Sequence, residues 1–102
     1  MKVYFVYILL CSNEGFYTGL TSQLSKRLQL HRDGLISDFT KKNLPISLVY
    51  FEMHTDFKSA LLREKQIRGW SRAKKKALSQ GEFKLLHRLA ECQNHTHYKY
   101  KP

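Results

Sequence analysis

Apolar side chains fill both the odd and the even positions of the segment from Val3 to Leu10. In a β-strand, these two sets of side chains point to opposite faces of the sheet. A strand that is apolar on both faces is covered on both sides, which is typical of a central strand. The polar residues from Ser12 to Gly15 then predict a turn, so the pattern indicates a β-hairpin.

The length of the turn decides which face of the hairpin each aromatic side chain occupies. Gly15 suits the left-handed position of a three-residue loop over residues 13–15, which would pair Cys11 with Tyr17. Tyr17 would then share a face with Tyr7, because partners across a sheet lie on the same face. A two-residue loop would reverse this, since a shift of one residue turns every side chain over. Asn-Glu is a poor type I′ pair, so we expect the three-residue loop.

Helical periodicity and capping residues mark the elements that follow the hairpin. A run rich in Val, Tyr and Phe after Pro45 indicates another strand, and Gly34 suits the C-terminal end of the first helix. The residues that can cap the expected helices at their N-termini are Thr21 or Ser22, Asp56 and Ser71. The expected elements are helices over residues 23–32, 57–68, 72–79 and 82–91, a strand over residues 47–52, a polar, basic loop over residues 35–44 and a loose tail over residues 93–102.

The predicted order of elements is β-β-α-β-α-α, followed by an extra C-terminal helix. This order favours an α/β fold of the α+β type, in which a small three-stranded sheet, mixed or antiparallel, carries helices on both faces. Gly81 is the expected boundary between two parts. Residues 1–80 would form the main domain, and residues 81–102 a C-terminal helix and polar tail appended to the same domain.

The charge of the chain is strongly one-sided. Its 102 residues contain 18 Lys and Arg against 8 Asp and Glu, which gives a net charge of +10. This surplus favours a polyanionic partner, most often a nucleic acid, over a surface that is basic only for solubility. Cys11 and Cys92, without a CxxC pair, indicate neither a disulfide framework nor a zinc site, and a cytoplasmic location fits best. No apolar run approaches the roughly 20 residues of a membrane helix, so we expect no membrane contact.

The first expected helix turns two basic side chains inward. Arg27 and His31 are four residues apart and therefore lie on one face, and His31 falls between Leu24 and Leu28 on the helical wheel. An imidazole and a guanidinium on the apolar side could serve a buried active site. The alternative is an arginine that reaches past the core to solvent and a half-buried structural histidine.

The helix over residues 57–68 turns a carboxylate inward. Glu64 lies within the apolar face of this helix, where an ionised carboxylate is costly unless a cation faces it. It could pair with an arginine, or bind a divalent metal through oxygen. The alternative is an ordinary glutamate at the edge of the core, paired with Arg68 or Lys65.

These polar side chains come from different elements and point toward the same side of the core. Hydrolysis of a phosphodiester uses a metal that polarises the phosphate, a base near the attacking water and a fixed cation for the developing charge. The chain has no GxSxG elbow, P-loop, GxGxxG, HExxH or deaminase signature that would favour another chemistry. The residues that we expect to form a phosphodiester-cleaving site are Tyr7, Tyr17, Arg27, His31 and Glu64.

At these residues the sequence resembles the GIY-YIG nuclease superfamily. Within it, the chain is similar to the small single-domain bacterial proteins that resemble the nuclease domain of the excinuclease C subunit. The first motif corresponds to Phe5-Val6-Tyr7, with Phe5 in place of the leading glycine, and the second corresponds to Tyr17-Thr18-Gly19. The further matches are Arg27, His31, Glu64 and the run from Trp70 to Lys75, which is typical of the small proteins.

The resemblance implies a metal-dependent endonuclease that hydrolyses phosphodiester bonds in DNA, of the kind used in DNA repair. It implies that one divalent ion, Mg²⁺ or Mn²⁺, binds Glu64, and that Tyr7 or Tyr17 acts as, or relays to, the general base. It also implies that Arg27, with or without His31, stabilises the phosphate and that Gly19 belongs to the fold motif. No small-molecule cofactor is implied.

Basic side chains outside this site could hold the backbone of DNA, or of RNA. Because no second DNA-binding domain is recognisable, we expect cleavage to depend on the structure of the nucleic acid rather than on its sequence. The first alternative function is a nucleic-acid-binding module with the same fold and no turnover, and the second is an interaction protein whose basic surface serves another anion. The candidate contacts, each with a plain solvated residue as its alternative, are Thr40, Lys41, Lys42, Arg72, Lys74, Lys75 and Lys76.

Overall fold

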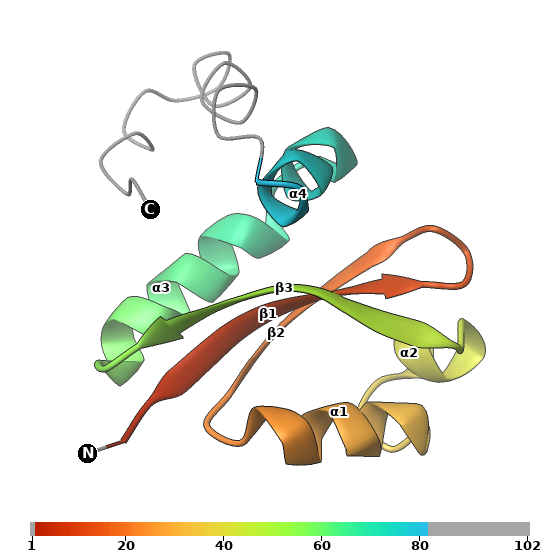
Figure 1. Cartoon of the computed structure of the whole chain (residues 1–102), viewed down its shortest axis with the longest axis horizontal. Coiled ribbons are helices and arrows are strands. Elements are labelled where there is room, and N and C mark those ends of the chain that lie inside the picture. The colour runs from red at the N-terminus through yellow and green to blue at the C-terminus, as the bar shows by residue number, and fades with distance from the viewer. Residues whose placement is uncertain (1, 82–102) are drawn as a thin grey trace. The chain divides into compact units, whose positions relative to one another are not determined.

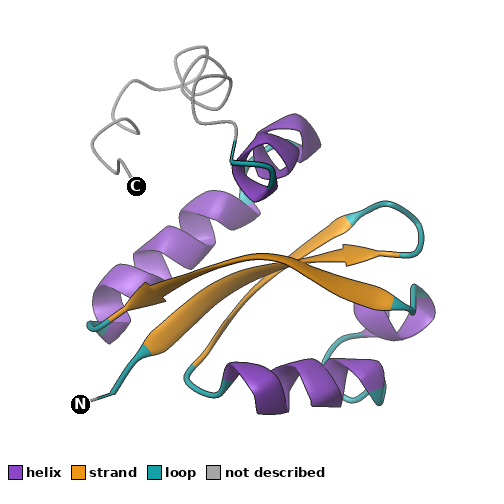
Figure 2. Ribbon diagram, viewed as in Figure 1, coloured by secondary structure: helices purple, strands orange, loops and turns teal. Residues whose placement is uncertain are grey.

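A three-stranded antiparallel sheet in the order β2-β1-β3 organises the chain in the computed structural model, which describes residues 2–81 (Figure 1). The strands are β1 (Tyr4–Cys11), β2 (Phe16–Thr21) and β3 (Ile46–His54). The helices are α1 (Leu24–Arg32), α2 (Asp38–Lys42), α3 (Phe57–Arg68) and α4 (Arg72–Ser79) (Figure 2). The predicted α+β class and the central position of β1 are confirmed, and both strand pairs are antiparallel.

The chain divides into two compact units between Gly69 and Trp70. The first unit contains the sheet with α1, α2 and α3, and the second contains α4. The expected helix over residues 82–91 and the expected tail over residues 93–102 lie outside the described residues. None of the helices within residues 2–81 has the length and hydropathy that a membrane span requires.

The hairpin between β1 and β2 has a three-residue loop, but one residue earlier than predicted. Glu14 N donates to Cys11 O and Cys11 N donates to Gly15 O, both at 2.9 Å, so the loop covers residues 12–14. The left-handed residue is Glu14, with φ of 65°, and not Gly15. The predicted pairing of Cys11 with Tyr17 is therefore wrong, because Tyr17 pairs with Leu9.

The register error is two positions, and an even shift leaves every side chain on its predicted face. Tyr7 and Tyr17 do share a face, as expected. Gly15 has a different role from the predicted one. A Cβ atom at Gly15 would lie 2.9 Å from Cζ of Phe39, so glycine lets the ring of Phe39 approach the hairpin.

Each face of the sheet carries a helix, as predicted. α1 packs on the face that holds Tyr7 and Leu9, with Leu28 in the same buried apolar cluster. α3 packs on the opposite face, where the ring of Phe57 meets the ring of Tyr4 at a centroid distance of 5.4 Å. The two helices therefore account for the apolar residues at both parities of β1.

Capping residues mark most of the helix termini at the positions that the sequence predicts. Gly34, with φ of 75°, follows α1 and donates from its N–H to His31 O at 3.0 Å. Asp56 caps α3 by accepting from Ser59 N at 2.8 Å, and Ser71 caps α4 by accepting from Lys74 N at 3.3 Å. The N-terminus of α1 differs from the expectation, because Gln23 occupies the cap position instead of Thr21 or Ser22.

The segment predicted as a loop over residues 35–44 contains α2. Ser37 caps this helix and accepts from Thr40 N at 3.2 Å. A helix of five residues is too short to show helical periodicity, and it is held by its cap and by tertiary contacts. β3 is also longer than the predicted span 47–52, because its ends pair with β1 from Cys11–Ile46 to Tyr4–His54.

Candidate active site

Tyr7 lies at the centre of the candidate site and is fully buried in the central strand. Its partner on β2 is Gly19. A Cβ atom at Gly19 would lie 2.8 Å from Cε2 of Tyr7, well inside the separation of about 3.5 Å at which carbon atoms pack. The phenol ring therefore occupies space that only glycine leaves open, which gives a physical reason for a glycine in the second motif.

His31 is the hydrogen-bond partner of the Tyr7 phenol. It lies on the last turn of α1, is fully buried, and places Nε2 2.9 Å from Tyr7 Oη. Its other ring nitrogen, Nδ1, lies 3.1 Å from Thr40 Oγ1 of α2. Both nitrogens of the imidazole thus have partners, and the ring is more enclosed than the half-buried structural histidine that the sequence left open.

Tyr17 completes a cluster of three rings on this face of the sheet. Its ring centroid lies 5.0 Å from that of His31 and 6.4 Å from that of Tyr7. Tyr17 is partly exposed, whereas Tyr7 and His31 are closed to solvent. The cluster therefore has an enclosed, hydrogen-bonded pair at its centre and one tyrosine at its margin.

Burial and charge set the protonation of this cluster. Burial raises the pKa of Tyr7 far above its usual range, with Tyr17 adding to the effect and Arg27 opposing it. Burial likewise raises the pKa of Tyr17. Burial lowers the pKa of His31 to about 4, and the positive charge of Arg27 adds to this. At neutral pH the imidazole is therefore uncharged and has a lone pair with which to accept a proton.

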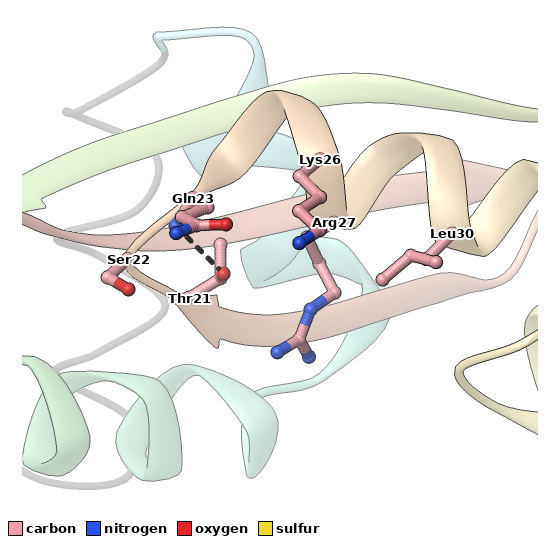
Figure 3. A pocket seen from close by; sticks show the side chains of 6 residues that line it. All are labelled: Thr21, Ser22, Gln23, Lys26, Arg27 and Leu30. Atoms are coloured by element: carbon pink, nitrogen blue, oxygen red, sulfur yellow. Dashed lines mark hydrogen bonds between the residues drawn. The ribbon is translucent and has the colours of Figure 1, made fainter.

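Arg27 connects the ring cluster to an open hollow at the junction of β2 and α1. The charge of Arg27 acts on Tyr7, Tyr17 and His31. The hollow has a volume of about 240 Å³, and Figure 3 shows the extended side chain of Arg27 beside it. Its lining residues are Thr21, Ser22, Gln23, Lys26, Arg27 and Leu30. Lys26, which is exposed and was not among the predicted site residues, gives the hollow a second cation.

Glu64 is buried as the helical wheel indicates, with an exposed fraction of 2%. Arg68 Nε donates to Glu64 Oε2 at 2.7 Å, so the partner is Arg68, one of the two that the structural alternative named. Arg68 itself is largely exposed, at 65%. The negative charge of Glu64 still acts on the ring cluster, because it raises the pKa values of Tyr7 and Tyr17.

The chemistry of Glu64 fits a hydrated divalent ion better than a metal enclosed by protein ligands. Within the described part of the chain, no group of three or more His, Cys, Asp or Glu residues could hold a metal. Mg²⁺ commonly binds one or two carboxylates and keeps several waters. Arg68 engages Oε2 of Glu64, and no hydrogen bond among residues 2–81 engages Oε1. One carboxylate oxygen therefore remains as a candidate ligand.

The predicted contacts to nucleic acid divide by exposure. Lys41 and Lys42 are exposed on α2, a helix rather than the predicted loop. Thr40 is fully buried and bonded to His31, so it cannot be the surface contact that the sequence suggested. In α4, Arg72 and Lys76 are exposed, whereas Lys74 and Lys75 are buried, which does not fit surface contacts. Lys74 places Nζ 5.2 Å from the centroid of the Trp70 ring.

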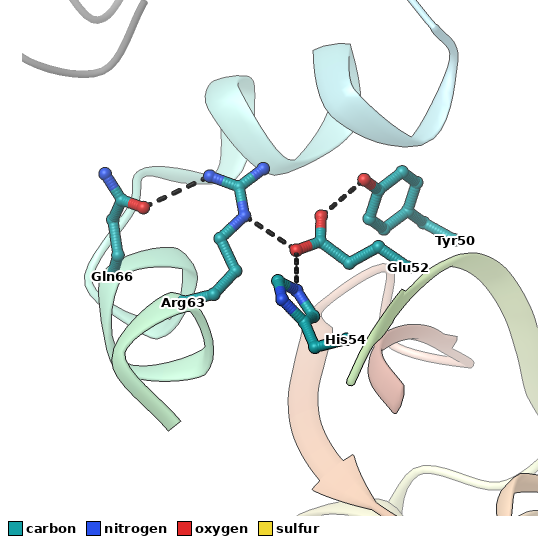
Figure 4. Close-up of polar contacts among 5 residues, drawn as sticks. All are labelled: Tyr50, Glu52, His54, Arg63 and Gln66. Atoms are coloured by element: carbon teal, nitrogen blue, oxygen red, sulfur yellow. Dashed lines mark hydrogen bonds and ion pairs between the residues drawn. The ribbon is translucent and has the colours of Figure 1, made fainter. Parts of the chain in front are cut away.

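A second polar cluster, which the sequence did not indicate, joins β3 to α3 on the opposite face of the sheet (Figure 4). Glu52 accepts hydrogen bonds from Tyr50 Oη at 2.6 Å, from His54 Nε2 at 2.7 Å and from Arg63 Nε at 2.9 Å. Burial alone would raise the pKa of Glu52, but these partners, Arg63 first, hold that pKa below its usual value. The cluster anchors α3 one residue before Glu64.

Two residues of functional interest were therefore missed from sequence, Thr40 in its observed role and Lys26. Nine positions separate Thr40 from His31, and no periodic pattern relates them. Lys26 had a detectable signal, because it precedes Arg27 at the start of a helix beside the second motif.

Known proteins resemble this chain over most of its length. The family described as the GIY-YIG catalytic domain matches residues 3–77. A UPF0213 protein of Haloquadratum walsbyi is 36% identical over 77 residues, covering 76% of this chain and 86% of its own. A UPF0213 protein of Syntrophus aciditrophicus is 43% identical over 76 residues, and the covered shares are 74% and 87%. A UPF0213 protein of Staphylococcus aureus is 39% identical, with shares of 74% and 92%.

Two solution NMR structures share the fold. A UPF0213 protein of Bacillus halodurans superposes with a TM-score of 0.51 at 29% identity, covering 76% of this chain and 83% of that one. A protein of E. faecalis superposes with a TM-score of 0.56 at 26% identity, covering 83% and 90%.

Proposed function

This chain belongs to the family of the GIY-YIG catalytic domain and is similar to small UPF0213 proteins, and from this premise we propose that it is a metal-dependent endonuclease acting on DNA. The observation that carries the proposal is the buried hydrogen bond of 2.9 Å between Tyr7 Oη and His31 Nε2. A phenol bonded to a neutral imidazole, with an arginine beside it, can move a proton next to an anionic group.

In the proposed reaction, Tyr7 acts as the general base and His31 as its proton acceptor. A water molecule attacks the phosphorus atom while its proton passes to Tyr7 Oη and the Tyr7 proton passes to His31 Nε2. The P–O bond to water forms, the P–O bond to the leaving nucleotide breaks, and the leaving oxygen takes a proton from solvent. His31 then releases the proton that it accepted to solvent, which its lowered pKa favours, and this restores the starting state. Because Tyr7 loses one proton as it gains another, its raised pKa is no obstacle.

Arg27 has two positions in this proposal. In the free protein Arg27 lies beside Tyr7, which is closed to solvent. The charge of Arg27 and its hydrogen bonding act to lower the pKa of Tyr7. When a phosphate enters the hollow, the guanidinium turns toward it, which exposes Tyr7 Oη to the attacking water. A planar guanidinium suits a phosphate because it can donate two parallel hydrogen bonds.

Glu64 is the residue that would hold a divalent ion, Mg²⁺ or Mn²⁺. When bound, such an ion supplies a Lewis acid that polarises the phosphate and stabilises the leaving oxygen. In its absence, Arg68 keeps the buried carboxylate paired. Tyr17, at the margin of the ring cluster, would contact the substrate side of the site.

Exposed cations around the hollow and on α2 support a nucleic-acid substrate. Lys26 lines the hollow, and Lys41 and Lys42 are exposed one element further along the chain. We propose that these side chains bind the phosphate backbone, so that cleavage follows the structure of the DNA rather than its sequence. A cytoplasmic location, where Cys11 would stay a free thiol, agrees with this role.

A cleavage assay tests the proposal. Purified protein is incubated with plasmid, single-stranded and branched DNA and with RNA of matching sequence, in the presence of Mg²⁺ or Mn²⁺. We expect cleavage of DNA by the wild type and a loss of about 100-fold or more in Glu64→Gln, which removes the charge but keeps the size of the side chain. Lys65→Gln, the exposed neighbour, serves as the matched control. Unchanged cleavage by Glu64→Gln would refute the mechanism.

The ion pair between Glu64 and Arg68 favours a second candidate function. A carboxylate that already has a cationic partner gives a stable site without any metal. The protein would then be a nucleic-acid-binding module with the same fold and no turnover. Salt-dependent binding to DNA without cleavage of any substrate in the assay would establish this function in place of the first.

A further inference from the structure

A continuous line of hydrogen bonds runs from the sheet through His31 into α2. Tyr7 Oη lies 2.9 Å from His31 Nε2, and His31 Nδ1 lies 3.1 Å from Thr40 Oγ1. Thr40 Oγ1 in turn donates to the carbonyl oxygen of Ser37 at 3.2 Å. Tyr7, His31 and Thr40 are fully buried, so each must find its partners within the protein.

Counting donors and acceptors gives these bonds a direction. Tyr7 has one proton to donate, and the acceptor that its hydroxyl meets is His31 Nε2, since the nearby Arg27 can only donate. Nε2 is then unprotonated, and the neutral ring carries its proton on Nδ1. Nδ1–H donates to Thr40 Oγ1, whose own proton goes to Ser37 O. Every proton in the line has an acceptor.

The opposite direction leaves one group without a partner. If Thr40 donated to Nδ1, the ring proton would sit on Nε2 and point at Tyr7 Oη. The proton of Tyr7 would then have no acceptor among residues 2–81. A buried donor without an acceptor is costly, so the first direction is the stable one.

α2 is built to hold Thr40 in place. Ser37 Oγ accepts from the backbone N–H of Thr40 at 3.2 Å, while Thr40 Oγ1 donates back to the Ser37 carbonyl. Two bonds between the same two residues fix both the backbone and the rotamer of Thr40. Thr40 is also the one buried residue of this helix, so α2 orients a single side chain rather than an apolar stripe.

We propose that Thr40 is a positioning residue: by accepting the Nδ1 proton of His31, it keeps Nε2 unprotonated and directed at Tyr7. The tautomer follows from the geometry, whereas its importance for catalysis rests on the proposed function. In the other tautomer, Nε2 would already carry a proton, and Tyr7 could not pass its own proton to it. Thr40 therefore acts on the reaction through His31 without touching the substrate.

The tautomer can be measured directly in the wild-type protein. Protonated and unprotonated ring nitrogens of histidine have well-separated ¹⁵N chemical shifts, so NMR of protein with ¹⁵N-labelled histidine identifies which nitrogen carries the proton. At neutral pH we expect His31 to be protonated at Nδ1 and unprotonated at Nε2. A protonated Nε2 would overturn the inference without the need for any variant.

Three variants then test the role of the hydroxyl. Thr40→Val removes it and should shift His31 toward the Nε2–H tautomer, with kcat lowered by about 10-fold to 100-fold and KM changed by less than about twofold. Thr40→Ser keeps the hydroxyl and should restore the tautomer and most of kcat. Thr18→Val is the control for the NMR measurement, because Thr18 is also a buried threonine and its Oγ1 has no hydrogen-bond partner among the described residues.

The outcomes separate this inference from the proposed function. A wild-type tautomer in Thr40→Val, or a loss of kcat in Thr40→Ser as large as in Thr40→Val, would overturn the positioning role. Failure of the proposed function would look different, because the wild type would cleave nothing while the tautomer still depended on Thr40. If Thr40→Val does not fold, the wild-type spectrum alone decides the tautomer.

Discussion

At the scale of single residues, the fit between Tyr7 and Gly19 leads to the first prediction. We expect Gly19→Ala to lower the free energy of unfolding by about 1–3 kcal/mol, because the added Cβ would lie 2.8 Å from Cε2 of a fully buried ring. Urea unfolding followed by circular dichroism measures the change. Gly69→Ala is the matched control, because its Cβ would lie 3.7 Å from the nearest atom, the Gln66 carbonyl oxygen. Equal stability of the two variants would contradict the prediction.

The burial of His31 leads to a second prediction, a loss of stability in mild acid. The pKa of His31 is about 4 in the folded chain and about 6.5 in a free histidine. Between these two pH values the imidazole is protonated in the unfolded state and neutral in the folded state. The contribution of His31 is therefore complete above about pH 6.5 and is lost progressively as the pH falls toward 4. We expect the free energy of unfolding to drop by about 2 kcal/mol between about pH 7.5 and pH 5.

The control for this prediction is His31→Gln, in which the free energy of unfolding should be nearly flat across the same range. Glu52 and Asp56 have lowered pKa values, so their contributions are lost only as the pH falls below about 4.5 and 3.8 respectively. They do not interfere with the window assigned to His31. An equal slope in His31→Gln and the wild type would show that another group causes the effect.

Helical periodicity predicted which residues face inward, but not what they meet there. His31 and Glu64 are both buried, as the wheel positions indicate. Their partners depend on tertiary structure, because the contact between His31 and Thr40 forms only once α2 folds beside α1. For Glu64, the sequence offered Arg68 and Lys65 as alternatives, and only side-chain geometry selects Arg68.

At the scale of elements, alternation along the strands was a stronger signal than the position of the turn. The predicted loop lay one residue late, because Gly15 was taken for the left-handed residue that is in fact Glu14. The predicted placement of the two tyrosines is still correct, because a register shift of two positions keeps Tyr17 on the face of Tyr7. α2 was missed for a different reason, because its five residues depend on one cap and one buried contact rather than on a pattern.

The attachment of α3 to the sheet leads to a third prediction. Arg63→Met keeps most of the length of the side chain but removes the cation from Glu52, which is only 18% exposed. We expect the free energy of unfolding to fall by about 1–3 kcal/mol, because a partly buried carboxylate would lose its one permanently charged partner in this cluster. Urea unfolding of Lys65→Met, an exposed change on the same helix, provides the control. Similar stability in both variants would contradict an anchoring role.

At the scale of the whole molecule, the net charge of +10 predicts attraction to nucleic acid but not where the nucleic acid binds. The location that we propose is the hollow beside Arg27, which is also lined by the exposed Lys26. Lys58 is also exposed but lies on α3, which packs on the opposite face of the sheet. Charge reversal at either lysine lowers the net charge by the same two units, so a comparison of the two separates location from total charge.

We therefore predict that Lys26→Glu weakens binding to DNA by about 10-fold and lowers the slope of log affinity against log salt by about one, the value for one lost phosphate contact. Lys58→Glu should weaken binding by less than about threefold, through long-range repulsion that salt screens. Fluorescence anisotropy of labelled DNA over a series of salt concentrations, without divalent metal so that no cleavage occurs, measures both. Equal losses of DNA affinity in the two variants would mean that total charge alone governs binding. That result would contradict the proposal that the hollow binds phosphate.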